Sequence, residues 1–174
     1  MVRQKYGYAE SGEIAATYGS HHIHSVIDEE NDLENGMLVV LDGDIDVENR
    51  SIKTPTATDK VSLVLDVILP YDQSTTARQA EYYYCHEAGK PTRVYDLVEN
   101  DKFPICDYLV TAPIAGAGKA CEKGNYLVAD ENRKYKEVAA ASFEADNVGF
   151  AAVIQDIEYK SNLTLYRLRV VKNG

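Results

Sequence analysis

A nine-residue pattern occurs twice in this chain of 174 residues. Residues 34–42 and residues 122–130 both read E-x-G-x-x-x-V-x-D. The glycine permits a positive φ at low steric cost, so the chain can turn sharply there. The apolar run that follows is too short for a helix and is partly β-branched, which favours a buried strand. The pattern predicts two turn-and-strand units in a sheet-rich fold, although short matches of this kind also arise by chance.

The chain after residue 34 alternates between apolar runs and polar turns. Residues 61–69 form the strongest apolar run, which predicts a strand buried on both faces. Residues 127–129 and 135–138 flank a short polar segment and predict a hairpin. We therefore expect a mostly β fold, an antiparallel β-sandwich or barrel, with at most short helices.

The C-terminal residues support the same fold class. Tyr166, Leu168 and Val170 alternate with two arginines, so they would share one face of a strand. Residues 149–159 are its expected antiparallel partner, with a turn at residues 160–162 between them.

Residues 1–33 differ from the rest of the chain. They are rich in Gly, Ser, His, Tyr and acidic residues, and their apolar residues are thinly scattered. Such a segment buries little apolar surface by itself. We expect an extended N-terminal arm over residues 1–33 that is ordered mainly by a neighbour, followed by a β-rich body over residues 34–174.

The chain has 13 tyrosines and no tryptophan. Tyrosine has an apolar ring and a polar tip and suits a surface that a partner covers. It also fills strand positions for its β propensity alone, and that interpretation stays open. The partner-contact candidates are the tyrosines of the arm and of one consecutive run: Tyr6, Tyr8, Tyr18, Tyr82, Tyr83 and Tyr84.

The formal net charge of −10 and the pI near 4.8 argue against a nucleic-acid partner. Binding to phosphates relies on clustered Lys and Arg that release counterions. The one basic strip, residues 133–136, lies beside Asp130, Glu131 and Glu137. We interpret this strip as a solvated turn of mixed charge.

Three cysteines lie far apart with no C-x-x-C spacing, which is typical of reduced thiols in a cytosolic compartment. The N-terminus lacks the apolar region of a signal peptide. No apolar stretch approaches the ~20 residues of a membrane helix. We expect a protein made in a cytoplasm, with no membrane partner.

Two motifs resemble ligand sites. Residues 115–120 are glycine-rich and contain Gly118-Lys119, but Pro113 and Ala120 stand where a phosphate-binding loop needs Gly and Ser or Thr. His22 and His24 would face one side of an extended segment and could hold a transition metal together with a nearby acid. Because a local pair on an arm is a weak site, we predict no metal and no cofactor.

Cys85-His86 suggests a thiolate nucleophile. Adjacent residues on a strand point to opposite faces, however, so the imidazole is poorly placed to activate the thiol. No local signature such as G-x-S-x-G is present. We expect no catalytic residues and no enzymatic activity.

Several segments together are similar to the head decoration proteins, or capsid-cement proteins, of tailed bacteriophages. The resemblance covers roughly residues 34–172 and is carried by short motifs: residues 34–40, 54–57, 84–95, 122–128 and 165–171. Members of this class are non-enzymatic, β-rich and coat the outside of an assembled capsid. This chain is longer than the smallest of them and has the acidic arm in front.

The resemblance implies a structural virion protein that decorates and stabilises a tailed-phage capsid. Its partner would be the major capsid protein, it would form a homo-oligomer, and it would lie on the capsid surface after synthesis in the host cytoplasm. One alternative is a head-fibre or tail-associated adhesion protein. Another is a small β-fold enzyme whose site the sequence does not reveal.

Overall fold

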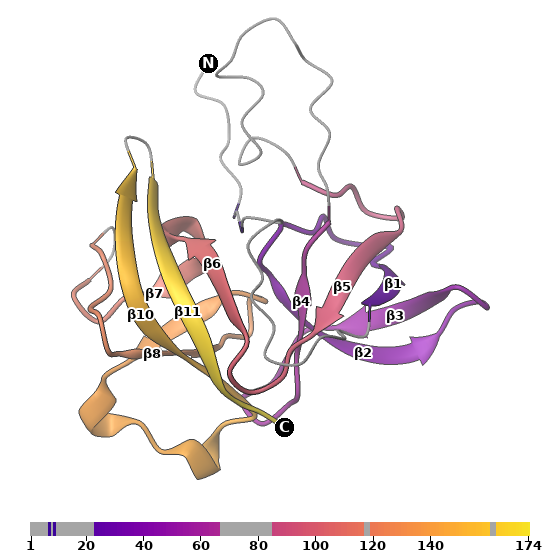
Figure 1. Ribbon diagram of the computed structural model, residues 1–174. Helices are drawn as coiled ribbons and strands as arrows, with labels where there is room; N and C mark the ends of the chain where they lie inside the picture. The colour runs from indigo at the N-terminus through magenta and orange to yellow at the C-terminus, as the bar shows by residue number, and fades with distance from the viewer. Residues whose placement is uncertain (1–6, 8, 10–22, 67–84, 117–118, 161–162) are drawn as a thin grey trace, which may run out of the picture.

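The computed structural model describes residues 7, 9, 23–66, 85–116, 119–160 and 163–174. Of these residues, 49% lie in strands and 7% in helices, and none of the helices among them reaches seven residues, which confirms the predicted mostly β fold class. Figure 1 shows two β bodies side by side, a five-stranded closed barrel and a six-stranded curled sheet. Each body is built from one continuous stretch of chain.

The N-terminal body is the barrel, with strand order β1-β3-β2-β4-β5. The pairing of β1 with both β3 and β5 closes it. Its strands are β1 (Ile23–Ile27), β2 (Leu38–Asp44), β3 (Asn49–Lys53), β4 (Ser62–Val64) and β5 (Thr92–Asp96).

The C-terminal body is the curled sheet, with strand order β6-β11-β10-β8-β9-β7. Its strands are β6 (Lys102–Cys106), β7 (Val110–Ala112), β8 (Tyr126–Ala129), β9 (Tyr135–Val138), β10 (Phe150–Lys160) and β11 (Leu163–Asn173). Three 3-10 helices accompany them: η3 (Asp107–Leu109), η4 (Ala140–Ser142) and η5 (Ala145–Asn147).

The two bodies share one topology. In the barrel, β2 pairs antiparallel with β3 and β4, and β4 pairs with β5; in the sheet, β8 pairs antiparallel with β9 and β10, and β10 pairs with β11. The barrel strand β1 is parallel to β3 and antiparallel to β5. In the sheet, two strands share the pairings that β1 makes alone in the barrel. Strand β7 is parallel to β9, as β1 is to β3, and β6 is antiparallel to β11, as β1 is to β5; η3 joins β6 to β7. The chain thus folds as two tandem units of the same five-stranded plan.

The repeated sequence pattern occupies equivalent places in the two units. Gly36 and Gly124 have φ values of 95° and 90°, as the pattern predicted. Gly36 donates its amide to the carbonyl of Val64 (2.7 Å), and Gly124 donates to the carbonyl of Ile154 (2.9 Å). Each of these strand residues returns a hydrogen bond to the carbonyl of the residue after the glycine (2.8 and 2.9 Å). Each turn therefore fixes its strand, β2 or β8, against the neighbouring β4 or β10.

One apolar core runs through both units. It includes side chains such as Leu63 and Val94 from the barrel, and Ile105 and Ile154 from the sheet, each at most 1% exposed. The predicted burial of residues 61–65 on both faces is confirmed, whereas residues 67–69 of that run lie outside the described part. The predicted hairpin β8–β9 and the pair β10–β11 are also present, and the predicted apolar face of the last strand is buried.

The β8–β9 turn fastens the sheet to the barrel. Arg133 forms an ion pair with Asp28, and Lys134 lies 3.2 Å from Glu34; all four side chains are largely buried. Tyr135 is fully buried behind them. The prediction of a solvated basic turn is therefore wrong, because the acids that neutralise this strip come from the other unit, about 100 residues away in sequence.

The folded body begins earlier than the predicted boundary at residue 33. Strand β1 lies within the predicted arm and closes the barrel. Val26 and Leu33 are buried in the core, which shows that a short strand needs few apolar residues when its neighbours supply the rest. Of residues 1–22, the structure describes Gly7 and Ala9, and Ala9 is buried.

Candidate functional site

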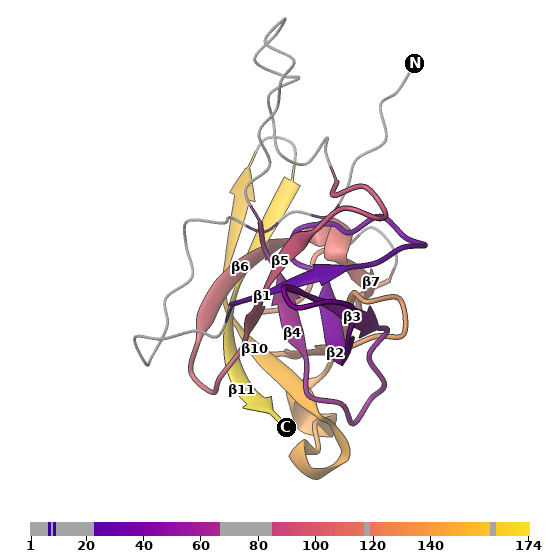
Figure 2. The ribbon, with the colours of Figure 1, turned by 90° about the vertical axis from the view of Figure 1, so that its right-hand side faces the viewer.

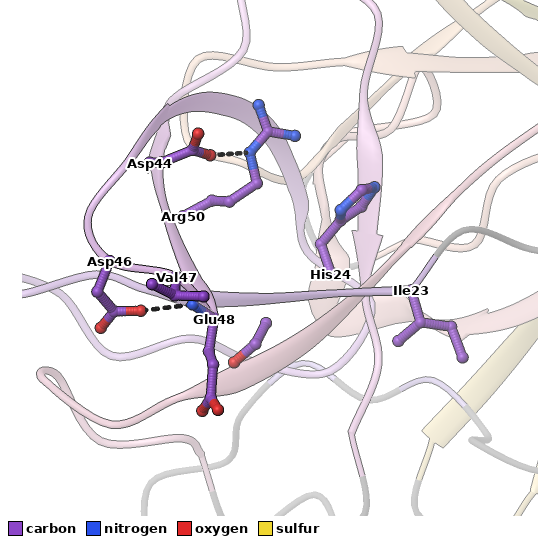
Figure 3. Close-up of a pocket in the computed structure, with 8 residues that line it drawn as sticks. Ile23, His24, Asp44, Asp46, Val47, Glu48 and Arg50 are labelled. Carbon is purple, nitrogen blue, oxygen red and sulfur yellow. Dashed lines mark hydrogen bonds and ion pairs between the residues drawn. The ribbon is translucent and has the colours of Figure 1, made fainter.

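An open hollow lies where strands β1 and β3 meet the β2–β3 turn (Figure 3). Its volume is about 320 Å³, and its wall is formed by Ile23, His24, Ser25, Asp44, Asp46, Val47, Glu48 and Arg50. A second hollow of about 380 Å³ shares His24 and Arg50 with the first and extends over β2 to Lys60, Ser62 and Asp96. Together the two hollows form a continuous surface on the barrel wall, which is polar around the turn and partly apolar over β2, where Val40 and Leu41 line it.

The shape of the β2–β3 turn is set by one carboxylate. Asp46 accepts hydrogen bonds from the amides of Glu48 (2.8 Å) and Asn49 (2.7 Å). The side chain of Asn49 also donates to it, and these hydrogen bonds lower the pKa of Asp46. Ser25 of β1 then donates to the Asn49 side chain (2.6 Å), which fixes the turn to the barrel wall.

A chain of three polar side chains crosses the base of the second hollow. Ser62 donates to one oxygen of Asp96 (2.8 Å), and the Nε2 atom of His24 lies 3.3 Å from the other oxygen. Burial alone would raise the pKa of Asp96, but the hydrogen bonds from Ser62 and His24 outweigh it and the net pKa is lowered. Asp96 is therefore ionised at neutral pH.

Arg50 separates the two hollows. Its Nε atom lies 3.2 Å from Asp44, and its Nη2 atom donates to the carbonyl of Asp42 (3.1 Å). Figure 3 shows the guanidinium of Arg50 paired with Asp44. This group gives the hollow a fixed positive charge in front of the acidic turn.

The arrangement suits binding better than nucleophilic chemistry. The Ser62 hydroxyl donates a hydrogen bond to Asp96, and the imidazole of His24 contacts Asp96 rather than the Ser62 hydroxyl. A serine nucleophile needs a base that hydrogen-bonds its own hydroxyl, and the order serine–carboxylate–histidine does not supply one. No group of three or more His, Cys, Asp and Glu able to hold a metal ion occurs among the described residues.

Apolar side chains project beside this polar surface. Val47, at the tip of the β2–β3 hairpin, is fully exposed, and Ile45 is 44% exposed. Ile23, in β1 on the same hollow, is 55% exposed. Figure 1 shows the β2–β3 hairpin extending away from the rest of the protein, and in Figure 2 the same strands face the viewer. The hairpin therefore offers apolar contacts between acidic side chains.

The six tyrosines predicted to contact a partner lie outside the described residues. Of the predicted histidine cluster, only His24 is described, and it pairs with Asp96 as stated above. Residues 117–118 of the glycine-rich loop are likewise outside the described part. The structure therefore tests few of the residues that the sequence singled out.

Cys85 and His86 occupy separate environments. The Cys85 thiol lies 3.7 Å from Asp32, whereas the His86 imidazole lies 2.9 Å from the Asn35 side chain. Burial lowers the pKa of His86. The two side chains thus use different partners, as expected for adjacent residues in an extended segment.

One carboxylate of the sheet has a structural role that the sequence did not reveal. Glu137 is 3% exposed and accepts hydrogen bonds from the amides of Ile114 (2.7 Å) and Glu122 (2.9 Å). It also accepts one from the side chain of Asn125 (2.8 Å). Burial alone would raise its pKa, but these hydrogen bonds lower it overall.

Comparison of the chain with protein-family models, with curated proteins and with solved structures gave no match. None of the described helices is long and apolar enough to cross a membrane.

The exposure of the β2–β3 hairpin was not predicted from the sequence. Residues 44–48 read D-I-D-V-E, with each apolar residue between acids. In a strand this alternation would put the acids on one face and the apolar residues on the other. In a protruding turn it instead exposes both kinds of side chain, and the sequence does not distinguish the two outcomes.

Proposed function

We propose that this protein is a non-enzymatic structural component of a tailed-phage virion, which decorates and stabilises the outside of the capsid. Its partner is the major capsid protein, it acts as a homo-oligomer, and it reaches the capsid surface after synthesis in the host cytoplasm. The resemblance of residues 34–172 to head decoration proteins supports this proposal. So does a two-unit β scaffold whose clearest surface feature is a protruding hairpin with exposed apolar side chains between acids.

The observation that carries the proposal is a difference between equivalent hairpins. The β8–β9 hairpin is packed against the barrel, and the Tyr135 hydroxyl donates to the carbonyl of Gly36 (2.9 Å). The β2–β3 hairpin is its counterpart, yet Ile45 and Val47 remain exposed. Since the β8–β9 hairpin of the sheet makes the contact between the units, we assign the contact with an external partner to the equivalent β2–β3 hairpin of the barrel.

The chemistry of the hairpin defines the surface that fits it. Val47 and Ile45 would enter an apolar depression, because removing exposed apolar area from water favours association. Asp44, Asp46 and Glu48 surround them and suit a rim of lysine or arginine on the partner. The capsid surface that binds this protein should therefore combine an apolar depression with a basic rim.

The experiment uses particles of the phage that encodes the chain. Mass spectrometry of purified particles should find the protein at high copy. The protein is then stripped, the particles are recoated, and their resistance to heat and osmotic shock is compared with that of uncoated particles. A ligand that binds only the assembled shell stabilises it by mass action, so recoated particles should resist both treatments better.

Matched variants test whether the hairpin makes the contact. The double change Ile45→Ser and Val47→Ser should weaken binding to particles at least about tenfold, as expected for apolar anchors at the centre of an interface. The control is Val98→Ser with Ile114→Ser, since these residues are 38% and 55% exposed elsewhere on the protein. Equal binding by both double variants would show that another surface makes the contact. Coated particles with unchanged stability would contradict the stabilising role and favour an adhesive one.

A further inference from the structure

Strand β10 is paired along only part of one edge. Its pairing with β8 covers Ala151 to Val153, and two hydrogen bonds extend it to Ile154. Beyond that point β10 runs on to Lys160, paired with β11 on its other side. Figure 1 shows the β10–β11 hairpin extending past the end of β8. Within the described residues, no strand pairs with the β8-side edge of residues 156–160.

The backbone direction along this edge follows from the hydrogen bonds of Ile154 and from an irregularity. Both backbone groups of Ile154 point toward the β8 side. A β-bulge at residue 155 shifts the register between Ile154 and Asp156 by one residue. Because an extra residue reverses the alternation, the backbone groups of Ile157 and Tyr159 face the β8-side edge, where the Asp156 carboxylate accepts a hydrogen bond from the Ile157 amide that pairing would replace.

We propose that two copies of this protein associate by antiparallel pairing of this edge of β10 about a two-fold axis at Glu158. The partner is a second copy, because this register makes the segment complementary to itself. Ile157 lies opposite Tyr159 of the second copy, and both residues have outward backbone groups, as a hydrogen-bonded pair requires. The inference concerns self-association and does not depend on the capsid.

The charges fit this register. Asp156 lies opposite Lys160 of the second copy, and the two-fold axis repeats this pair. Asp156 also lies 3.3 Å from Lys123 through one of its carboxylate oxygens. The two Glu158 side chains meet at the axis, and each is 3.1 Å from its own Arg167, which offsets their repulsion. An alternative register with the two-fold axis at Ile157 would instead put Asp156 of each copy opposite Glu158 of the other, which pairs like charges.

The apolar side chains also support the pairing. Ile157 packs on the edge of the core, and Tyr159 is 73% exposed on the same face of the strand. Pairing would cover each Tyr159 with Ile157 of the second copy, which is a favourable aromatic and β-branched cross-strand pair. Charged residues and a bulge often protect strand edges from association. Here Asp156 and Lys160, which self-pairing brings together, are opposite in sign, and Arg167 offsets the like charges of the two Glu158 side chains.

The interface is small. Stable interfaces bury about 1,200–2,000 Å² in total, which is more than a five-residue edge supplies. We therefore expect a weak dimer with a dissociation constant on the order of 10–100 µM. Sedimentation equilibrium of the full chain should show a reversible monomer–dimer equilibrium.

Charge reversal tests the register. Lys160→Glu puts two acids opposite each other, and Asp156→Lys puts two lysines opposite each other, so each variant alone should dimerise about tenfold more weakly. A one-to-one mixture restores two attractive pairs and should dimerise about as well as the wild type. Circular dichroism would verify that both variants are folded. A mixture that stays as weak as its components would overturn the register.

A second measurement needs no variant. Amide hydrogen exchange of the wild type at rising concentration should slow at Ile157 and Tyr159, whose amides face the edge. Exchange at Asp156 and Glu158, whose amides face β11, should stay unchanged. A protein that remains monomeric up to about 1 mM, or that dimerises with no change in exchange at Ile157 and Tyr159, would overturn the proposal.

Discussion

Two glycines in equivalent turns give a matched test of the contact between the two units. Gly36 and Gly124 have nearly the same positive φ and the same hydrogen-bond pattern. A Cβ atom at Gly124 would have no neighbour within 4 Å. A Cβ atom at Gly36 would overlap Leu109 of η3 in the other unit and lie 3.1 Å from Ala9. Replacing each glycine by alanine therefore separates backbone strain from packing.

The expected losses follow from these two terms. Forcing an L-residue into a left-handed conformation costs roughly 1–2 kcal/mol, so Gly124→Ala should lower the free energy of unfolding by about that amount. Gly36→Ala carries the same strain together with an overpacking term of about 1–3 kcal/mol, because Leu109 is fully buried and has little room to move. We expect a total loss of about 2–5 kcal/mol for Gly36→Ala.

Urea unfolding followed by far-UV circular dichroism measures both losses. The shared core predicts a single transition for the wild type, so midpoints are comparable if the slopes agree. In the Gly36→Ala background, Leu109→Ala should cost less than it does alone, because it removes the overlap. Equal losses for the two glycine variants would refute the argument that Gly36 is packed against the second unit.

Two further predictions concern stability. Leu65 is 2% exposed, so Leu65→Ala should lower the free energy of unfolding by about 2–5 kcal/mol through the cavity that it leaves. A loss below ~1 kcal/mol in a urea titration would place Leu65 outside the core. Acid should also destabilise the protein, because the pKa values of Asp28, Asp96 and Glu137 lie below their ordinary values of 3.8 and 4.5 in the folded state. Their stabilisation is present above these ordinary values and is lost as the pH falls through the lower folded values. Urea midpoints measured from pH 7 to pH 2 should therefore fall, and Glu137→Gln should flatten the decline; a parallel decline in that variant would contradict the role of Glu137.

Local patterns predicted the elements that depend on local chemistry. The glycine turns, the β8–β9 hairpin and the buried face of β11 were all visible in the sequence, because turn residues and period-two alternation leave direct marks. Strand β1 was missed, because Val26 is its one buried residue and its pairing with β3 and β5 is non-local. A short strand completed by distant neighbours leaves little trace in its own residues.

The ion pairs between the two units could not be predicted from local sequence patterns either. Arg133 and Asp28 are 105 residues apart, so the sequence showed a mixed-charge turn where the fold forms an ion pair. The repeated pattern suggested two similar units, but the shared topology became visible only through strand order and hydrogen bonds. The exposure of Val47 was hidden for the opposite reason, since a protruding turn and a half-buried strand have the same alternation.

The shared topology makes the differences between the units informative. The docked β8–β9 hairpin carries Arg133, which meets Asp28 just after β1, and Lys134, which meets Glu34 in the Gly36 turn. The free β2–β3 hairpin is acidic, and the turn at Gly124 contains an acid, Glu122, whose neighbour Lys123 is already paired with Asp156. Like charges at these positions oppose a repeat of the same contact between molecules, which would otherwise join copies head to tail without limit. This charge distribution supports the proposed closed pair through β10 and the proposed use of the acidic hairpin for a partner of different chemistry.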